Sequence, residues 1–235
     1  MALGDIEQTN SVVQAALRER EDADFLQIGE LLEKRRFRLG IKRVFDILIS
    51  LVGLLCVGIF FIAIGALIKI DSKGPVFYKQ TRVGKNGKPF RILKFRTMVV
   101  DADRTGQLIT VGEDSRITKV GRFLRRTKID ELPQIINIIK GDMSFVGPRP
   151  EVLKYVSMYS DAQAQVLLVR PGITDIASIE YRNESDILAL SEDPERTYIE
   201  EIMPRKLSYN MQYLKNISVI NDVRIICTTV LKVLK

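Results

Sequence analysis

Histidine and tryptophan are absent from the 235-residue sequence, and there are only two cysteines. Without histidine, the chain cannot use a Ser-His-Asp triad or a Cys-His pair. Any catalysis must therefore depend on carboxylates, Lys, Arg, Tyr, Ser or a bound metal ion. The cysteines, Cys56 and Cys227, give no sign of a disulfide framework or of metal-ligand spacing. They indicate a reducing compartment and exclude a Cys/His metal site.

Acidic residues are outnumbered, with 29 Asp and Glu against 36 Lys and Arg, which gives a net charge of +7. A basic chain suits a phosphate-rich partner, namely nucleic acid, anionic lipid, a nucleotide or a phospholipid substrate. A composition of 46% hydrophobic and 28% charged residues excludes both a disordered chain and a bundle of transmembrane helices. The length fits one domain and a membrane segment.

One long stretch has no charged residue, the 22 residues from Ile47 to Ile68. As a helix it would be about 33 Å long, enough to cross the core of a bilayer. The stretch is apolar on all sides rather than along one stripe, which favours a membrane segment over a buried core helix.

Basic residues flank this stretch on both sides. Residues 34–43 carry six basic residues and no acidic one, and residues 69–96 carry nine basic residues and one acidic one. The positive-inside tendency places both flanks in the cytoplasm. A hairpin that enters and leaves through the same face satisfies both flanks, whereas a spanning helix satisfies only one. The charges favour a re-entrant helix with its bend at Gly53 or Gly58.

The domains expected from this pattern are a polar N-terminal extension over 1–40, a re-entrant membrane helix over 41–70 and a cytosolic catalytic domain over 71–235. The catalytic domain is predicted to be α+β, mostly helical with a small strand region. Strands are predicted at 76–80 and 89–95, joined by a turn at Gly84–Gly87. Helices are predicted from Pro133 to Ile139, over 150–168, over 194–213, and over an amphipathic stretch at 217–235 that packs on the domain or on the membrane surface.

Paired carboxylates, Asp130 and Glu131, follow the basic stretch GRFLRRTK (121–128) at a predicted helix start. A carboxylate near a helix N-terminus is favoured as the ion. Arginines such as Arg125 keep it ionised and can grip phosphate with two hydrogen bonds. The pair marks either a site where anions meet a metal ion or a simple helix cap.

Three further motifs place cations on rigid or extended backbone. GDMSFVGPRP (141–150) contains Asp142 and holds Arg149 between two prolines. Arginine held by a stiff loop suits a phosphate or a carboxylate. The other two motifs are KFRTM (94–98), with Lys94 and Arg96 on one face of a strand, and RPGIT (170–174), with Arg170 before Pro-Gly. Each of the three also fits an ordinary turn or a solvated strand edge.

Taken together, these blocks resemble the bacterial sugar transferases, the small monotopic polyprenyl-phosphate phosphoglycosyl transferases. The resemblance covers residues 41–235. The blocks that carry it are, in order, KRVFD (42–46), GPVFYKQTRVG (74–84), KFRTM (94–98), KIDELPQ (128–134), GDMSFVGPRP (141–150), RPGIT (170–174) and KNIS (215–218).

The resemblance implies a monotopic membrane protein with a re-entrant helix hairpin and amphipathic helices on the membrane surface. Its place would be the bacterial inner (cytoplasmic) membrane, with the catalytic domain on the cytoplasmic face. The implied partners are a UDP-sugar, undecaprenyl phosphate and membrane phospholipid, without nucleic acid, and a homodimer is left open.

The resemblance also implies a reaction. Asp130 would be the nucleophile, acting with Mg²⁺ that it also binds, and Glu131 would orient the metal or the pair. A covalent phosphosugar intermediate forms as UMP leaves, and the phosphosugar then passes to the polyprenyl phosphate, which initiates capsule, O-antigen, exopolysaccharide or glycoprotein assembly. The residues expected to bind substrate or phosphate are Lys94, Arg96, Arg125, Arg149, Asp142 and Arg170.

Two departures and two alternatives accompany the resemblance. Many family members have Ser-Pro where the membrane helix breaks, and this chain has Gly58-Ile59; the stretch after RPGIT, DIASIEYRN (175–183), also differs and leaves the sugar open. One alternative is a conventional glycosyltransferase that releases UDP and uses the Asp-x-Asp motif at residues 101–103. The other is a non-enzymatic membrane protein whose basic face binds nucleic acid or lipid.

Overall fold

The structure, a computed structural model, describes residues 28–100, 102 and 114–234. A helical stretch over residues 28–34 leads into the long helix α2. The first half of the chain contains α2 (Arg36–Asp71), β1 (Phe77–Val83), η1 (Lys85–Gly87), β2 (Pro89–Phe95), α3 (Lys119–Arg126), η3 (Ile129–Glu131), α4 (Gln134–Lys140) and β3 (Ser144–Val146). The second half contains α5 (Leu153–Val156), α6 (Asp161–Ala164), η4 (Gln165–Leu168), β4 (Gly172–Thr174), α7 (Ile176–Glu180), α8 (Glu184–Ala189), α9 (Pro194–Thr197), η5 (Tyr198–Ile202), α10 (Met203–Lys215) and α11 (Val219–Leu234).

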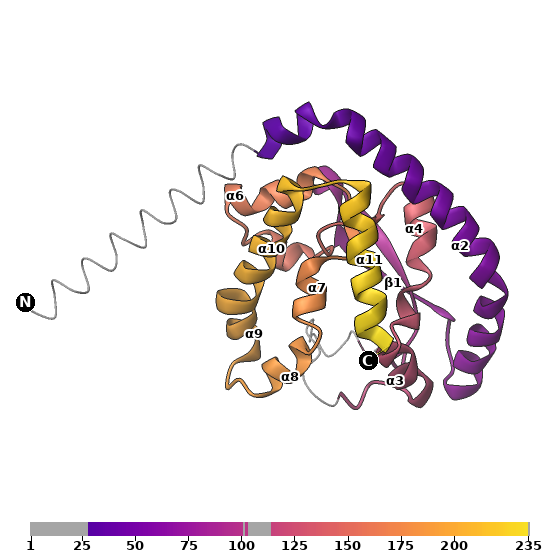
Figure 1. Cartoon of the computed structure of the whole chain (residues 1–235). Coiled ribbons are helices and arrows are strands. Elements are labelled where there is room, and N and C mark those ends of the chain that lie inside the picture. Colours follow the sequence, from indigo (N-terminus) through magenta and orange to yellow (C-terminus); the bar gives the residue numbers. More distant parts are fainter. Residues whose placement is uncertain (1–27, 101, 103–113, 235) are drawn as a thin grey trace, which may run out of the picture.

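The mostly helical α+β architecture with a small strand region is confirmed, and Figure 1 shows the helices around two small sheets. The predicted strand at 89–95 is β2, which pairs antiparallel with β1 across the predicted turn. The single helix predicted over 150–168 is wrong. Ser160 begins a new helix there, because its side chain and that of Gln163 form a capping box. The stretch is therefore divided into α5, α6 and η4.

A second, parallel pairing joins β3 to β4 and brings two of the motifs together. The backbones of Gly147 and Gly172 cross so closely that a Cβ on Gly172 would lie 2.2 Å from the nitrogen of Gly147. Glycine is needed at this crossing because any side chain would collide with backbone. The loop that carries Arg149 is thus fixed against the stretch that carries Arg170.

The main core lies under α7, α10 and α11, where Tyr213, Leu214 and Val146 are fully buried. Ile28 and Leu32, which the sequence assigned to the polar extension, also pack into this core. The helical stretch over residues 28–34 therefore belongs to the folded body in the described part of the chain.

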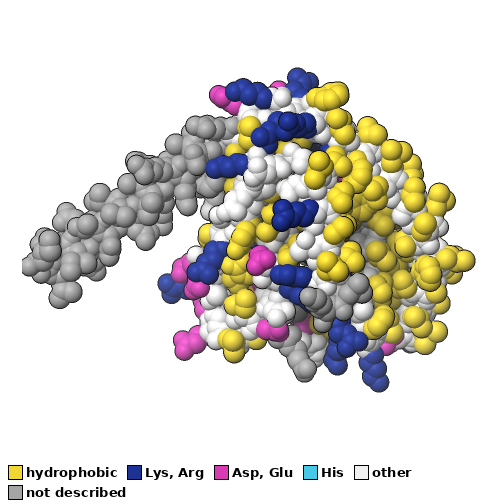
Figure 2. All heavy atoms as spheres, viewed as in Figure 1, with side chains coloured by type: hydrophobic (Ala, Val, Ile, Leu, Met, Phe, Trp, Pro, Cys, Tyr) yellow, Lys and Arg dark blue, Asp and Glu magenta, His cyan; other side chains and the backbone are white. Residues whose placement is uncertain are grey.

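Helix α2 runs without interruption from Arg36 to Asp71 and is long and apolar enough to cross a membrane by length and composition. In Figure 1 it curves around the outside of the domain, and Figure 2 shows hydrophobic side chains gathered along that side. The helix continues through Gly53 and Gly58 because this stretch has no proline to remove a hydrogen bond. The expected hairpin is not seen, and a gentle curve takes its place.

The N-terminal part of α2 is held by a buried ionic network. Lys42 donates a hydrogen bond to Asp222 of α11 and lies 3.7 Å from Asp46. Tyr213 donates to the other oxygen of Asp222 at 2.8 Å, and its hydroxyl also lies 3.2 Å from the carbonyl oxygen of Val146. This network joins the start of α2 to α10, α11 and β3.

The C-terminal end of α2 is held by the same domain. Arg96 donates to the carbonyl oxygen of Ser72 at 2.6 Å and to its hydroxyl at 2.9 Å. Ile68 and Phe61 pack against Phe95 of β2. Both ends of the apolar helix are therefore fastened to one body.

Replacing Lys42 with methionine should lower the free energy of unfolding by about 3 kcal/mol, because it leaves two buried carboxylates without a counter-ion. The thermal midpoint in detergent micelles measures this. Lys154→Met is the matched control, since Lys154 pairs with Glu195 where both side chains are nearly half exposed, and its loss should cost less than about 1 kcal/mol. Equal midpoints for the two variants would contradict the role of the buried network.

Candidate active site

Asp130 and Glu131 lie on the short turn η3, directly after α3. Lys128 connects the two elements in the left-handed conformation with φ 58°. That sharp reversal turns the chain inward, so Asp130 is only 6% exposed and Glu131 only 7%. Two adjacent carboxylates at this depth need compensation for the water that they have lost.

Glu131 has that compensation from two cations on distant segments. Lys94 of β2 donates to Oε1 of Glu131 at 2.9 Å. Arg149 donates to Oε1 at 2.5 Å and to Oε2 at 3.3 Å, so its guanidinium grips the carboxylate with two nitrogens. Burial alone would raise the pKa of Glu131, but the charges and hydrogen bonds of Arg149 and Lys94 outweigh it and hold this pKa well below its ordinary value.

Asp130 lacks such partners. Its Oδ1 atom is buried and accepts no hydrogen bond from any described residue. Burial raises the pKa of Asp130; Lys94 opposes the rise and the negative charge of Glu131 adds to it. The two neighbouring carboxyl groups thus have pKa values shifted in opposite directions, a pattern typical of paired catalytic carboxylates.

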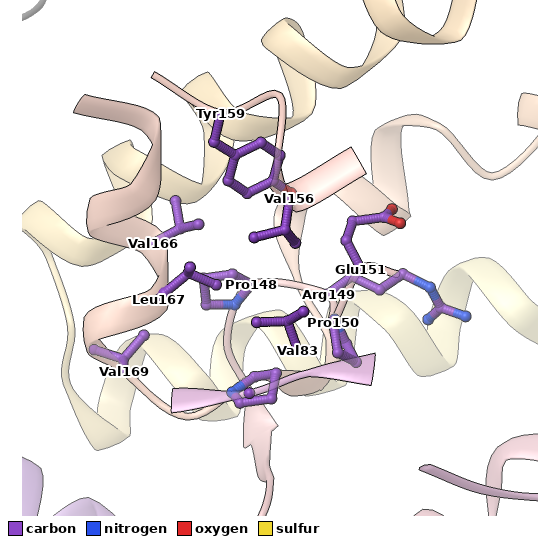
Figure 3. A pocket seen from close by; sticks show the side chains of 12 residues that line it. Val83, Pro148, Arg149, Pro150, Glu151, Val156, Tyr159, Val166, Leu167 and Val169 are labelled. Atoms are coloured by element: carbon purple, nitrogen blue, oxygen red, sulfur yellow. The ribbon is translucent and has the colours of Figure 1, made fainter. Parts of the chain in front are cut away.

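Arg149 is held in place through its backbone as well as its side chain. Its amide donates to Asp175 at 3.1 Å. Figure 3 shows its side chain extending away from the apolar residues Val166, Leu167 and Val169 that line a small pocket behind the loop. Asp175 is not among the site residues predicted from the sequence, although an Asp before an apolar run is the signal of a helix N-cap. It does cap α7, by accepting from the amide of Ser178.

Arg125 of α3 belongs to the same neighbourhood. Its Nε donates to the hydroxyl of Thr97 at 2.9 Å. Burial lowers the pKa of Arg125, and the charges of Asp130 and Glu131 are among those that act on it. The site therefore gathers Lys94, Arg125 and Arg149 around the two carboxylates.

Three expected phosphate-binding residues contact other parts of the fold. Arg96 follows the last residue of β2, so the strand alternation with Lys94 no longer governs it, and it reaches Ser72. Arg170 donates to the carbonyl oxygen of Gly141 at 2.8 Å, and Asp142 accepts from the side chain of Asn137. The contacts of Arg170 and Asp142 lie at the far end of α4, about 10 Å along the helix from its start beside Glu131.

The described residues contain no group of three or more His, Cys, Asp or Glu side chains that could hold a metal ion. Glu131 is paired with two cations, whereas the buried Oδ1 of Asp130 accepts from no donor in the described part of the chain. Mg²⁺ is commonly bound through one or two carboxylates, water and substrate phosphates. Asp130 fits such a site. Asp101 and Asp103 of the Asp-x-Asp motif lie outside the described residues.

The two carboxylates should respond oppositely to neutral substitution. Asp130→Asn should leave the free energy of unfolding at neutral pH unchanged or up to about 1 kcal/mol higher, because the raised pKa shows that the fold favours the neutral form. Glu131→Gln should lower it by about 3 kcal/mol, because Lys94 and Arg149 lose their counter-ion. Chemical denaturation of both variants in detergent checks this.

The pH dependence of the free energy of unfolding is a second test of the directions of these two pKa shifts. A depressed pKa means that Glu131 contributes its full stability above its ordinary pKa and loses it as the pH falls through the folded value. A raised pKa means that Asp130 weakens the fold at neutral pH, where burial opposes its charge. Below its ordinary pKa, Asp130 is protonated in the folded and the unfolded state alike and no longer weakens the fold. The advantage of Asp130→Asn should therefore vanish in acid. A larger advantage in acid would contradict the assignment.

Comparison with known proteins identifies the family of the chain. The family model described as "Bacterial sugar transferase" matches residues 37–235. A protein of Bacillus subtilis (strain 168), "Uncharacterized sugar transferase EpsL", is 39% identical over 194 residues, which cover 83% of this chain and 87% of that protein. Two longer relatives are similar over their matching parts.

One of them is a "UDP-glucose:undecaprenyl-phosphate glucose-1-phosphate transferase" of Klebsiella pneumoniae, 37% identical over 81% of this chain and 39% of that protein. The other is a "UDP-N-acetylgalactosamine-undecaprenyl-phosphate N-acetylgalactosaminephosphotransferase" of Aeromonas hydrophila, 35% identical over 88% of this chain and 47% of that protein. The chain thus spans less than half the length of these two relatives. With the family model covering most of its length, the chain belongs to the bacterial sugar transferase family.

Proposed function

We propose that the chain transfers a sugar-1-phosphate from a UDP-sugar to undecaprenyl phosphate and releases UMP, which initiates polysaccharide or glycoconjugate assembly. The observation that carries this proposal is the contrast between Asp130, whose buried Oδ1 accepts no hydrogen bond from the described residues, and Glu131, which is held by two cations. The names of the relatives from Klebsiella and Aeromonas support the substrate class, and they differ in the sugar.

In the proposed reaction, a carboxylate oxygen of Asp130 forms a bond to the phosphorus that carries the sugar. The bond from this phosphorus to the oxygen of UMP breaks, and its electron pair leaves with UMP. An oxygen of undecaprenyl phosphate then attacks the same phosphorus, and the bond to Asp130 breaks to restore the carboxylate. A carboxylate nucleophile needs no histidine base, which agrees with a sequence that has none.

The surrounding cations fit this chemistry. A diphosphate that approaches a carboxylate is repelled, and Lys94, Arg125 and Arg149 place positive charge beside the reacting groups. Glu131 keeps Lys94 and Arg149 in place through its ion pairs. Mg²⁺ bound at Asp130 and the donor phosphates would add charge that stabilises the transferred group.

Purified protein with undecaprenyl phosphate, Mg²⁺ and a panel of UDP-sugars, including UDP-glucose and UDP-N-acetylgalactosamine, should release UMP. Asp130→Asn should lose at least about 1,000-fold in rate, because the nucleophile is gone. Without the lipid acceptor, mass spectrometry of the wild type should find a phosphosugar on Asp130. Release of UDP would instead establish ordinary glycosyl transfer, and no release from any donor would favour a non-catalytic membrane protein.

We also propose that α2 lies in the cytoplasmic leaflet of the bacterial inner membrane with both ends on the cytoplasmic face. The support is that Lys42 and Ser72, near its two ends, are bound to one domain, and that both flanks are basic. The outward side of α2 exposes large apolar side chains that suit phospholipid, and α11 beside it exposes Ile220 and Leu231.

Cysteine labelling in intact cells checks this topology. Cys56 and Cys227 are first replaced by serine, and single cysteines are then placed at the exposed positions Lys34 and Lys73. A membrane-impermeant reagent should label neither site in intact cells and both sites in inside-out vesicles. Labelling of one site from outside would show that α2 spans the membrane.

A further inference from the structure

Gln134, the first residue of α4, is a buried amide with an unused donor. The residue is 1% exposed, and its Nε2 atom has no hydrogen-bond partner in the described part of the chain. An unpaired buried donor destabilises a fold, so each one in a native protein calls for an explanation. A ligand that binds during function is one source of such a partner.

Asn137, three residues later on the same helix, shows what a structural amide looks like here. It is equally buried at 1%. Its Nδ2 donates to the carbonyl oxygen of Arg91 at 2.8 Å and to Asp142 at 3.2 Å, and its Oδ1 accepts from the amide of Leu93 at 3.0 Å. The surroundings of α4 can thus satisfy a buried amide completely, which sets Gln134 apart.

The unused donor lies four residues after the unused acceptor of the site in sequence. Leu132 and Pro133 have right-handed helical dihedral angles, so Gln134 follows Asp130 by about one turn, the spacing at which side chains are neighbours. Oδ1 of Asp130 and Nε2 of Gln134 are both buried and both unpaired. Glu131, between them in sequence, is fully engaged by Lys94 and Arg149.

We propose that Gln134 is a substrate-contacting residue whose amide donates a hydrogen bond to an oxygen of the phosphoryl group that Asp130 receives. The inference rests on the proposed function and names one further residue for it. A phosphoryl group bonded to Asp130 brings acceptor oxygens to within one helical turn of Gln134. A side-chain amide suits this contact, because its N–H groups donate hydrogen bonds that phosphate oxygens can accept.

Gln134→Met keeps the length of the side chain and removes the donor. In the UMP-release assay it should lower kcat by about 10- to 100-fold, the range for one lost hydrogen bond to a charged group. Its thermal midpoint should equal or exceed that of the wild type, because an unpaired polar group is gone. Asn137→Leu is the matched control and should lower the midpoint, because the backbone of Arg91 and Leu93 loses its partners.

Two results would overturn the inference. One is a Gln134→Met variant with wild-type kcat and KM. The other is a fall in midpoint as large as that of Asn137→Leu together with unchanged kcat in the folded fraction, which would make Gln134 a structural amide satisfied by water.

A binding measurement separates this inference from the proposed function. Inorganic pyrophosphate with Mg²⁺ should raise the thermal midpoint of Asp130→Asn more than that of the double variant Asp130→Asn, Gln134→Met. Equal shifts would overturn the contact of Gln134 with phosphate. Absence of UMP release from the wild type, with unequal shifts, would overturn the proposed reaction and leave the contact standing.

Discussion

The ion pairs of Glu131 with Lys94 and Arg149 are the interaction on which the site depends. They join three segments that are distant in sequence: strand β2, the turn η3 and the loop after β3. Arg149 can reach Glu131 only because its loop is fixed by the glycine crossing with β4. The buried carboxylate of Glu131 thus holds β2, η3 and the loop of Arg149 together, and it brings positive charge close to Asp130.

Asp130 and Glu131 are adjacent in sequence and have opposite effects on the stability of the fold. Glu131 stabilises the fold through its two ion pairs, whereas Asp130 weakens it, since its buried Oδ1 has no hydrogen-bond partner among the described residues. The two buried side-chain amides of α4 differ in the same way. Nδ2 of Asn137 donates hydrogen bonds, and Nε2 of Gln134 has no partner in the described part of the chain. Groups that serve the fold and groups left for a ligand alternate along one short stretch of chain, which is how a small domain can be both stable and reactive.

Local sequence patterns predicted much of the secondary structure and several residues of the candidate site. Strand β2, the short helix after Pro133 and the pairing of acidic with basic motifs follow from period, turn residues and charge. The direction of Arg96 could not be predicted, because it depends on where β2 ends and on the neighbouring end of α2. The helix cap at Asp175 could be predicted from its position before an apolar run, but its contact with the amide of Arg149 and the unpaired amide of Gln134 could not, because they depend on which buried atoms find partners after folding. The basic residues that flank α2 predict that both of its ends lie on the same side of a membrane. They do not determine whether the helix bends sharply or curves between its ends.

The contact between Lys42 and Asp222 joins residues that are 180 positions apart, one at the start of the apolar helix and one in the last helix. A ribosome makes Lys42 180 residues before it makes Asp222, and it makes Asp46 soon after Lys42. Until then, two charges on the apolar helix lack the partner that the finished fold provides. A product that stops before Asp222 would therefore lack the contact that holds the N-terminal part of α2 to the domain, and the charges there would still favour water.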